Sequence, residues 1–125
     1  MNVVDSSGWL EYFADGENAS FFAPAIEDLE RLIVPTICIY EVFKRVMGQR
    51  GEDAALVTVG DMYQGHVVDL NAPIALAAAK HSVEQKIAMA DSLILATARA
   101  YDAAIWTQDA DFVSLEGVEY IQKNS

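Results

Sequence analysis

The sequence predicts an α/β fold in which a doubly wound sheet of about five mainly parallel strands carries helices on both faces. Short apolar runs alternate with helical patterns along the chain, and this alternation is typical of parallel strands joined by crossover helices. The connection between the third and fourth strands is longer and holds two helices. The length of 125 residues suits a single domain, residues 1–125, without repeat or linker.

The predicted strands are short and rich in branched apolar residues. They cover residues 2–5, 32–34, 66–70, 103–107 and 118–121. In a doubly wound sheet, ligands bind outside the carboxyl ends of the strands, where the strand order reverses. The residues that directly follow each strand are therefore the first candidates for a functional site.

The predicted helices show apolar residues at helical spacing between capping and turn residues. Ser6 or Ser7 caps the first helix, which ends at Asp15-Gly16, and Thr36 caps the third. The later helices cover about 18–30, 36–47, 52–64, 72–86 and 91–101, with turns at 48–51 and 111–115. The helix from Asp91 is apolar nearly all round, so we expect it to be buried.

Composition and charge exclude several classes of protein. Hydrophobic residues make up 53% of the chain, which excludes intrinsic disorder. The net charge of −11 argues against a broad basic face for nucleic acid and favours a cationic partner, such as a metal ion or a basic protein segment. Cys38 is the single cysteine, which excludes an internal disulfide and indicates a reducing compartment.

Targeting and membrane signals are not found in the sequence. No uncharged apolar run approaches the ~18 residues of a membrane span. The N-terminus MNVVDSSGW carries no basic residue before its first apolar run, unlike a secretory signal. We therefore expect a soluble cytoplasmic domain that does not contact a membrane.

Acidic residues follow the predicted strands and converge if the first and fourth strands are neighbours. They are Asp5 after the first strand, Glu41 on the helix after the second, Asp91 at the start of the buried helix, and Asp109 and Asp111 after the fourth, next to Thr107. Two of them have an ordinary structural alternative as helix caps, namely Asp5 and Asp91. A carboxylate on a helix that is apolar on every side is, however, poorly solvated and needs a cation or strong donors.

The remaining acids also have structural alternatives. Glu41 has Lys44 and Arg45 three and four residues later, which by itself favours a solvated ion pair on the helix surface. Asp109 and Asp111 are typical turn residues. Taken together, however, several acids without a neighbouring histidine or cysteine form an all-oxygen ligand set, which suits Mg²⁺ or Mn²⁺. Such ions activate water and stabilise the charge on phosphate, so the set indicates phosphoryl chemistry.

Four motifs carry a resemblance to a known family. They are VVDSS at the N-terminus, YEVFKR around Glu41, ADSLILATA from Ala90 and WTQDADF from Trp106. In order and spacing they span essentially the whole chain. The chain resembles a PIN domain and, within that group, the VapC-type toxins of bacterial and archaeal toxin–antitoxin pairs. This resemblance implies a PIN-like parallel-sheet fold, endoribonuclease activity that depends on Mg²⁺ or Mn²⁺, inhibition by a cognate antitoxin, and a homodimer.

The resemblance also assigns roles to residues. Asp5 matches the first family aspartate, Glu41 the helical glutamate and Asp91 the third acid. The Thr-x-Asp pattern favours Asp109 as the fourth acid, although many members place it later, which leaves Asp111 open. The implied catalytic residues are Asp5, Glu41, Asp91 and Asp109, and the implied metal ligands are Asp5, Asp91, Asp109 and Asp111.

Further residues are expected to support this chemistry. Ser7 and Thr107 match small hydroxyl residues beside the acids, and Lys44 and Arg45 are the candidates for RNA backbone contacts. Aromatic residues crowd the first two helices, where most are core and some are expected to form a groove for a basic or aromatic antitoxin segment. This set consists of Trp9, Tyr12, Phe13, Phe21 and Phe22.

Two other functions are compatible with parts of the pattern. One is a free-standing PIN-type nuclease in RNA processing, without an antitoxin. The other is a receiver-type phospho-acceptor domain, which needs an acidic pair after the first strand and a lysine after the fifth. Here Asp5 is followed by two serines, the third strand ends in Asp69-Leu70, and Lys123 lies close to the end of the chain. Ser7 also disfavours a phosphatase with an Asp-x-Asp pair.

Overall fold

The computed structural model describes residues 1–124 and contains one five-stranded sheet with the order β3-β2-β1-β4-β5. Every strand pair in these residues is parallel. The chain runs from β1 through β2 to β3 at one edge and then returns to β4 beside β1, so the strand order reverses between β1 and β4. The strands are β1 (Asn2–Val4), β2 (Leu32–Pro35), β3 (His66–Val68), β4 (Ala104–Thr107) and β5 (Val118–Tyr120). The predicted α/β doubly wound fold is confirmed.

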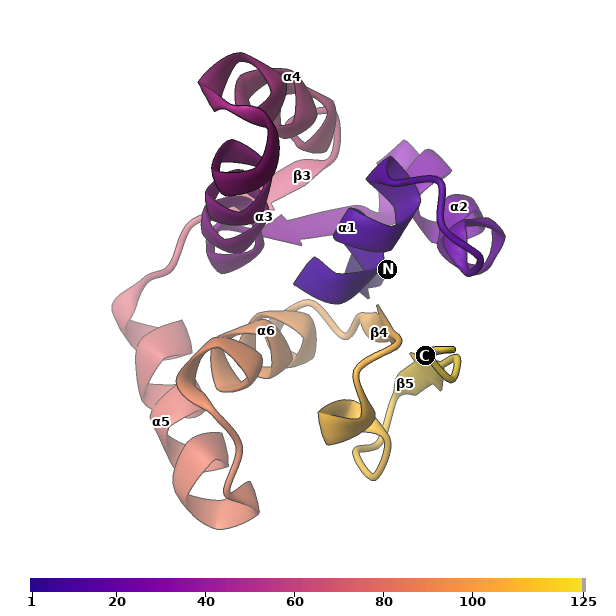
Figure 1. The fold of residues 1–125 in the computed structure, drawn as a ribbon. Coiled ribbons are helices and arrows are strands. Elements are labelled where there is room, and N and C mark those ends of the chain that lie inside the picture. Colours follow the sequence, from indigo (N-terminus) through magenta and orange to yellow (C-terminus); the bar gives the residue numbers. More distant parts are fainter. Residues whose placement is uncertain (125) are drawn as a thin grey trace.

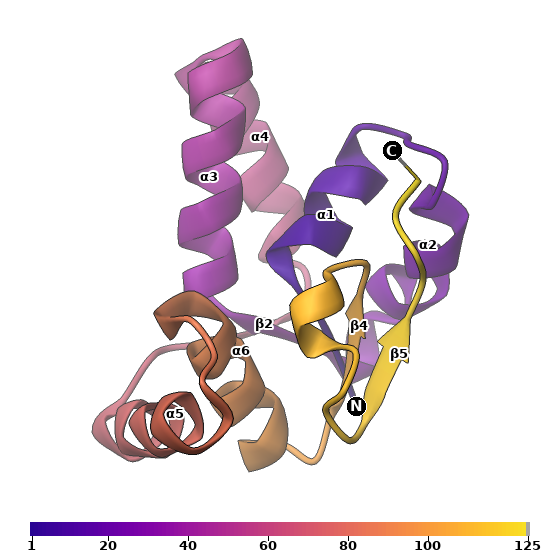
Figure 2. The same cartoon turned by 60° about the horizontal axis from the view of Figure 1, so that its bottom comes forward.

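Helices cover both faces of this sheet (Figures 1 and 2). They are α1 (Ser6–Phe13), α2 (Ala19–Glu27), α3 (Thr36–Arg50), α4 (Glu52–Met62), α5 (Ala72–Gln85) and α6 (Met89–Ala100), with 3₁₀ turns at Leu29–Arg31 and Ala110–Phe112. One face is covered by α1 and α2, and the other by α6 with α5 packed outside it. The hairpin of α3 and α4 extends from the sheet, and α3 contacts both α1 and α6.

The core lies between the strands and the helices that cover them. Val3 and Val4 of β1 are fully buried, as expected for a central strand covered on both faces. On α6 all residues from Ser92 to Ala98 are buried, which confirms the expectation from its apolar composition. Its first turn, which carries Asp91, therefore lies at the boundary of the core.

The cap of α1 differs from the prediction. Asp5 is the N-cap residue, in an extended backbone conformation, and its Oδ1 accepts a hydrogen bond from the Gly8 N–H at 2.9 Å. Ser6 and Ser7, which the sequence suggested as caps, are the first two residues of the helix. The reason is that β1 ends at Val4, one residue earlier than predicted, so the non-helical junction residue is Asp5.

The third and second helices also differ from their predicted bounds. The helix α3 runs through Gly48 to Arg50 and ends at Gly51, whose φ of 90° only glycine adopts easily, so the predicted turn at 48–51 is wrong. Thr36 does not cap this helix, because it is the first helical residue and Pro35 is the N-cap residue. The Thr36 hydroxyl accepts from the Leu70 N–H at 3.3 Å. The helix α2 ends at Glu27, and residues 29–31 form a separate 3₁₀ turn.

A glycine substitution tests the close packing of α1 against the sheet. A Cβ at Gly8 would lie 2.6 Å from Phe22 Cε1 and 2.7 Å from Val4 Cγ1. We expect Gly8→Ala to lower the free energy of unfolding by about 1–2 kcal/mol, because overpacking outweighs the gain in helix propensity. Gly60→Ala, on α4 with open space at the Cβ position, is the matched control and should stabilise by about 0.5–1 kcal/mol. Urea denaturation measures both, and an equal gain for Gly8→Ala would contradict this packing.

Candidate active site

The carboxyl ends of β1 and β4 meet at the point where the strand order reverses. Asp5 follows β1, and its backbone N–H donates to the Trp106 carbonyl of β4 at 3.1 Å. Thr107 is the last residue of β4, with Asp109 two positions later. The predicted neighbourhood of the first and fourth strands is therefore confirmed, and with it the convergence of the acids that follow them.

Asp5 is held by three donors although it is only 2% exposed. Thr107 Oγ1 donates to Asp5 Oδ2 at 2.6 Å, Ser7 Oγ donates to Oδ1 at 2.8 Å, and the Gly8 N–H donates to Oδ1 at 2.9 Å. Burial raises the pKa of Asp5, and these three hydrogen bonds offset part of that rise, so the pKa of this carboxyl is about 6. The predicted supporting hydroxyls of Ser7 and Thr107 both contact this carboxylate.

Thr107 also connects Asp5 to the loop after β4. Its Oγ1 accepts a hydrogen bond from the Asp109 N–H at 2.8 Å while it donates to Asp5. Asp109 Oδ1 in turn accepts from the Asp111 N–H at 2.9 Å and so caps the 3₁₀ turn that follows. One hydroxyl thus fixes the relative positions of the first and fourth acids.

Asp91 lies in the first turn of α6 and is half-buried. Within residues 1–124 no hydrogen bond or ion pair reaches its carboxylate. Burial is the largest cause that raises the pKa of Asp91, followed by the negative charges of Asp109, Asp111, Asp5 and Glu41. Together they raise it to about 6. Asp91 is thus a poorly solvated carboxylate that faces other acids without a donor, which is an arrangement that a cation stabilises.

Three of the acids lie close enough to share one ion. A carboxylate oxygen from each of Asp91, Asp109 and Asp111 lies within 4.8 Å of the other two. Asp109 is half-buried and lines the same cavity as Asp5, whereas Asp111 is exposed and lines the neighbouring cavity on the far side of Asp91. The structure therefore brings both candidates for the fourth acid to Asp91. This all-oxygen donor set fits a hard divalent cation such as Mg²⁺ or Mn²⁺.

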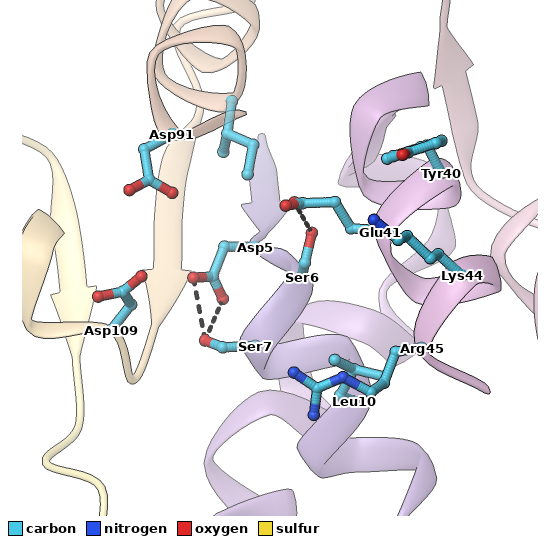
Figure 3. Close-up of a pocket in the computed structure, with 11 residues that line it drawn as sticks. Asp5, Ser6, Ser7, Leu10, Tyr40, Glu41, Lys44, Arg45, Asp91 and Asp109 are labelled. Carbon is cyan, nitrogen blue, oxygen red and sulfur yellow. Dashed lines mark hydrogen bonds between the residues drawn. The ribbon is translucent and has the colours of Figure 1, made fainter. Parts of the chain in front are cut away.

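Glu41 reaches the site from α3. Ser6 Oγ donates to Glu41 Oε1 at 2.6 Å, so the start of α1 holds a residue 35 positions away in the sequence. The only ion pair among residues 1–124 joins Arg31 to Asp28, so the alternative of a helix ion pair from Glu41 to Lys44 or Arg45 is wrong. Figure 3 shows the Glu41 carboxylate on one side of Asp5 and those of Asp91 and Asp109 on the other.

A cavity of about 550 Å³ contains these groups together with two cations. Its charged lining consists of Asp5, Glu41, Asp91, Asp109, Lys44 and Arg45. The Lys44 Nζ lies 5.7 Å from the centre of the Tyr40 ring. Four carboxylates and two exposed cations thus line one cavity. The two residues that the sequence suggested as RNA backbone contacts both line the same cavity as the acids.

Several residues of the site were not predicted. Ser6 was considered only as a helix cap, and its contact with Glu41 depends on how α1 and α3 pack, which no local pattern shows. Gln108 is buried, and its Oε1 accepts from Asn18 Nδ2 at 2.9 Å. Asn18 Nδ2 also donates to the Gln122 carbonyl at 3.3 Å, so Asn18 links Gln108 to the last residues of the described chain. In the sequence, the only sign of a role for Gln108 was its position between Thr107 and Asp109. Cys38 is buried in the core, and burial raises the pKa of its thiol, so it serves as a packing residue.

Solved structures with the same fold include a toxin–antitoxin complex and a toxin. A toxin–antitoxin complex from Klebsiella pneumoniae matches with a TM-score of 0.81 and 19% identity, over 95% of this chain and 96% of that chain. The toxin VapC20 from Mycobacterium tuberculosis, described as cleaving the sarcin–ricin loop, has a TM-score of 0.78 and 17% identity, over 95% of this chain and 98% of that chain. FitAcB from Neisseria gonorrhoeae has a TM-score of 0.74 and 19% identity, over 98% and 97%. Identities this low show a shared fold.

Within residues 1–124, no helix combines the length and the apolar character that crossing a bilayer requires.

The sequence comparisons are more specific about the family. No curated protein matches the chain. The family model of the PIN domain, in contrast, matches residues 3–118, which is nearly the whole chain. On this match the chain belongs to the PIN domain family.

Proposed function

We propose that the chain is a cytoplasmic, divalent-metal-dependent endoribonuclease and the toxin of a toxin–antitoxin pair. The observation that carries the proposal is the convergence of Asp5, Glu41, Asp91 and Asp109 on one cavity from four separate elements of the fold (Figure 3). Membership of the PIN domain family and the toxin complexes among the structures of the same fold support it. The sarcin–ricin loop that VapC20 cleaves supports RNA as the substrate class.

The ligands that we assign to Mg²⁺ or Mn²⁺ are Asp5, Asp91, Asp109 and Asp111. Mutual proximity of the last three supports the assignment, as does the lack of any donor to Asp91 within residues 1–124. When bound, the ion activates water and stabilises the negative charge that develops on the phosphate. These carboxylates would hold the ion near the carboxyl ends of β1 and β4, in a cavity that Lys44 and Arg45 also line.

The protein's own groups orient the reacting partners. Thr107, Ser7 and the Gly8 N–H fix both oxygens of Asp5. Ser6 engages one oxygen of Glu41 and leaves the other to accept a proton from the attacking water. Lys44 and Arg45, on the same helix as Glu41, contact the RNA backbone and neutralise its phosphates. We therefore propose Asp5, Glu41, Asp91 and Asp109 as the catalytic residues.

A groove between α1, α2 and α4 is our candidate for the antitoxin. This cavity of about 340 Å³ has aromatic and apolar walls, including Tyr12 and Phe13, and two carboxylates, Glu27 and Asp61. An antitoxin segment with aromatic and basic residues fits both features. We also propose a homodimer, which is consistent with the exposed apolar side chains of Leu76 and Val83 on α5.

The alternative functions have less support. The phospho-acceptor alternative conflicts with membership of the PIN domain family, and Asp69 after β3 is exposed and outside the acidic cavity. A free-standing PIN-type nuclease uses the same site, and no residue contact favours it over the toxin. A short neighbouring reading frame that encodes a DNA-binding head and a basic or aromatic tail would identify the toxin.

The first prediction concerns the acids themselves. Asp5→Asn and Asp91→Asn should each lower the rate of RNA cleavage by about 10²-fold or more, because each removes a charge that the reaction requires. Asp69→Asn is the control, since Asp69 is exposed and outside the cavity. The measurement is cleavage of a labelled RNA in Mg²⁺, with circular dichroism to show that each variant folds. Cleavage that persists in EDTA, or in the Asp5/Asp91 double variant, would exclude the metal mechanism.

The second prediction concerns stability and pH. The folded-state pKa of Asp91 is raised to about 6 from 3.8, so the folded chain binds more protons than the unfolded chain between these values. Stability therefore falls as the pH rises through this window. At pH near 7 we expect Asp91→Asn in EDTA to be more stable than the wild type by about 1 kcal/mol, after allowance for partial exposure, or roughly 4 °C in Tm.

Calorimetry at two pH values checks this expectation. The gain from Asp91→Asn should disappear near pH 4, where the wild-type carboxyl is neutral, and Mg²⁺ should stabilise the wild type much more than the variant. Asp69→Asn again serves as the control for a change in net charge. If Asp91→Asn lowers Tm at both pH values by the same amount, the crowding of acids around Asp91 does not destabilise the fold.

The third prediction concerns Thr107. Among the hydrogen bonds to Asp5, the one from the Thr107 hydroxyl lowers the pKa of Asp5 most. Thr107→Val removes this bond and should therefore raise the pKa of Asp5 further. Thr107→Ser keeps the hydroxyl and should leave that pKa close to the wild-type value. An NMR titration of the Asp5 carboxyl carbon in EDTA measures the difference. Equal pKa values in the two variants would show that this hydroxyl does not stabilise the carboxylate.

A further inference from the structure

A second cavity opens directly beside the acidic one. It has a volume of about 340 Å³ and shares Ser7, Leu10 and Arg45 with the acidic cavity. In Figure 3 the Arg45 side chain extends from α3 towards Leu10 of α1, which places it at the junction of the two cavities. A chain molecule bound in the acidic cavity can therefore continue into the second without leaving the surface.

The charge of this second cavity is opposite to that of the molecule as a whole. Arg45, Arg50 and Lys123 line it, and all three are exposed. Its one carboxylate, Glu11, is already engaged, because Glu11 Oε2 accepts from the Asn18 N–H at 2.8 Å. Three cations therefore gather in one cavity of a chain that has only eight and a net charge of −11. We call this cavity the cationic groove.

The surface on the other side of the acids has a different character. Beyond Asp91 lies a cavity of about 500 Å³ whose charged lining is Lys86, Asp91 and Asp111. Carboxylates outnumber cations there, so a strand of phosphates is attracted less strongly on this side. The antitoxin groove between α1, α2 and α4 has Glu27 and Asp61 and no cation in its lining. Of these cavities, the cationic groove is thus the one whose lining favours a polyanion.

We infer that the cationic groove holds the sugar–phosphate backbone of single-stranded RNA on one side of the cleaved phosphate, with Arg50 and Lys123 as phosphate contacts beyond Arg45. This inference rests on the proposed function. The walls of the groove fit such a strand, because Leu10 and Phe13 offer apolar surface for a ribose or base between the cations. An acidic peptide would match the charges equally well, but it would not explain why the groove continues into the site of phosphodiester hydrolysis.

The inference also gives a direction to substrate binding. Lys44, Arg45, Arg50 and Lys123 lie in the acidic cavity or the groove, whereas Lys86 is the one cation lining the cavity beyond Asp91. The enzyme would therefore hold its RNA mainly by the nucleotides on the groove side. The product fragment on the other side is then released more readily.

Binding of a fluorescein-labelled single-stranded RNA tests the groove. The parent is the Asp91→Asn variant in Mg²⁺, which prevents cleavage during the measurement, and the readout is fluorescence anisotropy at several salt concentrations. The test variant adds Arg50→Gln and Lys123→Gln. The matched control adds Lys80→Gln and Arg99→Gln, which change the net charge equally but lie on α5 and α6, outside both cavities.

We expect the Kd of the test variant to rise about tenfold relative to the control. The salt dependence should weaken as well, with the slope of log K against log salt falling in magnitude by about 1.4, since each phosphate contact on a single strand contributes about 0.7. Equal Kd values and slopes in test variant and control would overturn the inference. So would a polyglutamate peptide whose binding is lost in the test variant while RNA binding is retained.

The outcome for the groove can be separated from the outcome for the proposed function. If the wild type fails to cleave any RNA in Mg²⁺ or Mn²⁺, the proposed function fails and the groove inference fails with it. If the wild type cleaves RNA and Asp91→Asn abolishes cleavage, the proposed function stands. In that case, equal binding of RNA by the test variant and the control overturns the groove alone.

Discussion

The buried carboxylate of Asp5 is the constraint on which the rest of the structure depends. It caps α1 through the Gly8 N–H and at the same time accepts from Thr107 at the end of β4. The structural and the functional interpretation of this residue are therefore not alternatives, because the carboxylate that caps the helix also lines the cavity of the acids. Its position fixes the start of α1 relative to the sheet, which in turn places Ser6 where it can hold Glu41 of α3.

The crowding of carboxylates at the carboxyl ends of the strands destabilises the fold, and hydrogen bonds within the chain offset this only in part. Asp5 has three donors to offset its burial, whereas Asp91 has none within residues 1–124 and faces four other acids. Parallel strands with right-handed crossovers bring their carboxyl ends to one edge, so the topology itself concentrates these charges. A site in which one acid is satisfied and its neighbour is not differs from an ordinary hydrogen-bonded core. It has the character of a site completed by a cation.

Local patterns in the sequence were enough to predict the strands and helices, because these depend on short-range periodicity. The order of the strands and helices was then enough to predict the sheet edge at which the acids meet. They were not enough for the ends of the helices. Gly48 is typical of a helix end, yet α3 continues through it to Arg50, because the packing of α3 against α4 outweighs the low helix propensity of one glycine. The contact between Ser6 and Glu41 and the burial of Gln108 depend on packing between distant segments, which periodicity does not contain.

The net charge of −11 gives a misleading estimate of how the chain meets a polyanion. At physiological ionic strength charges act over about 8–10 Å, so acids elsewhere on the surface count for little at a site that they do not line. What matters is the local lining: three cations in the groove against Glu11, whose carboxylate is bound to the Asn18 N–H. The acids of the neighbouring cavity would repel phosphate less once the divalent ion that we propose is bound there. An acidic domain can therefore bind RNA, provided that its few cations stand beside the metal ligands.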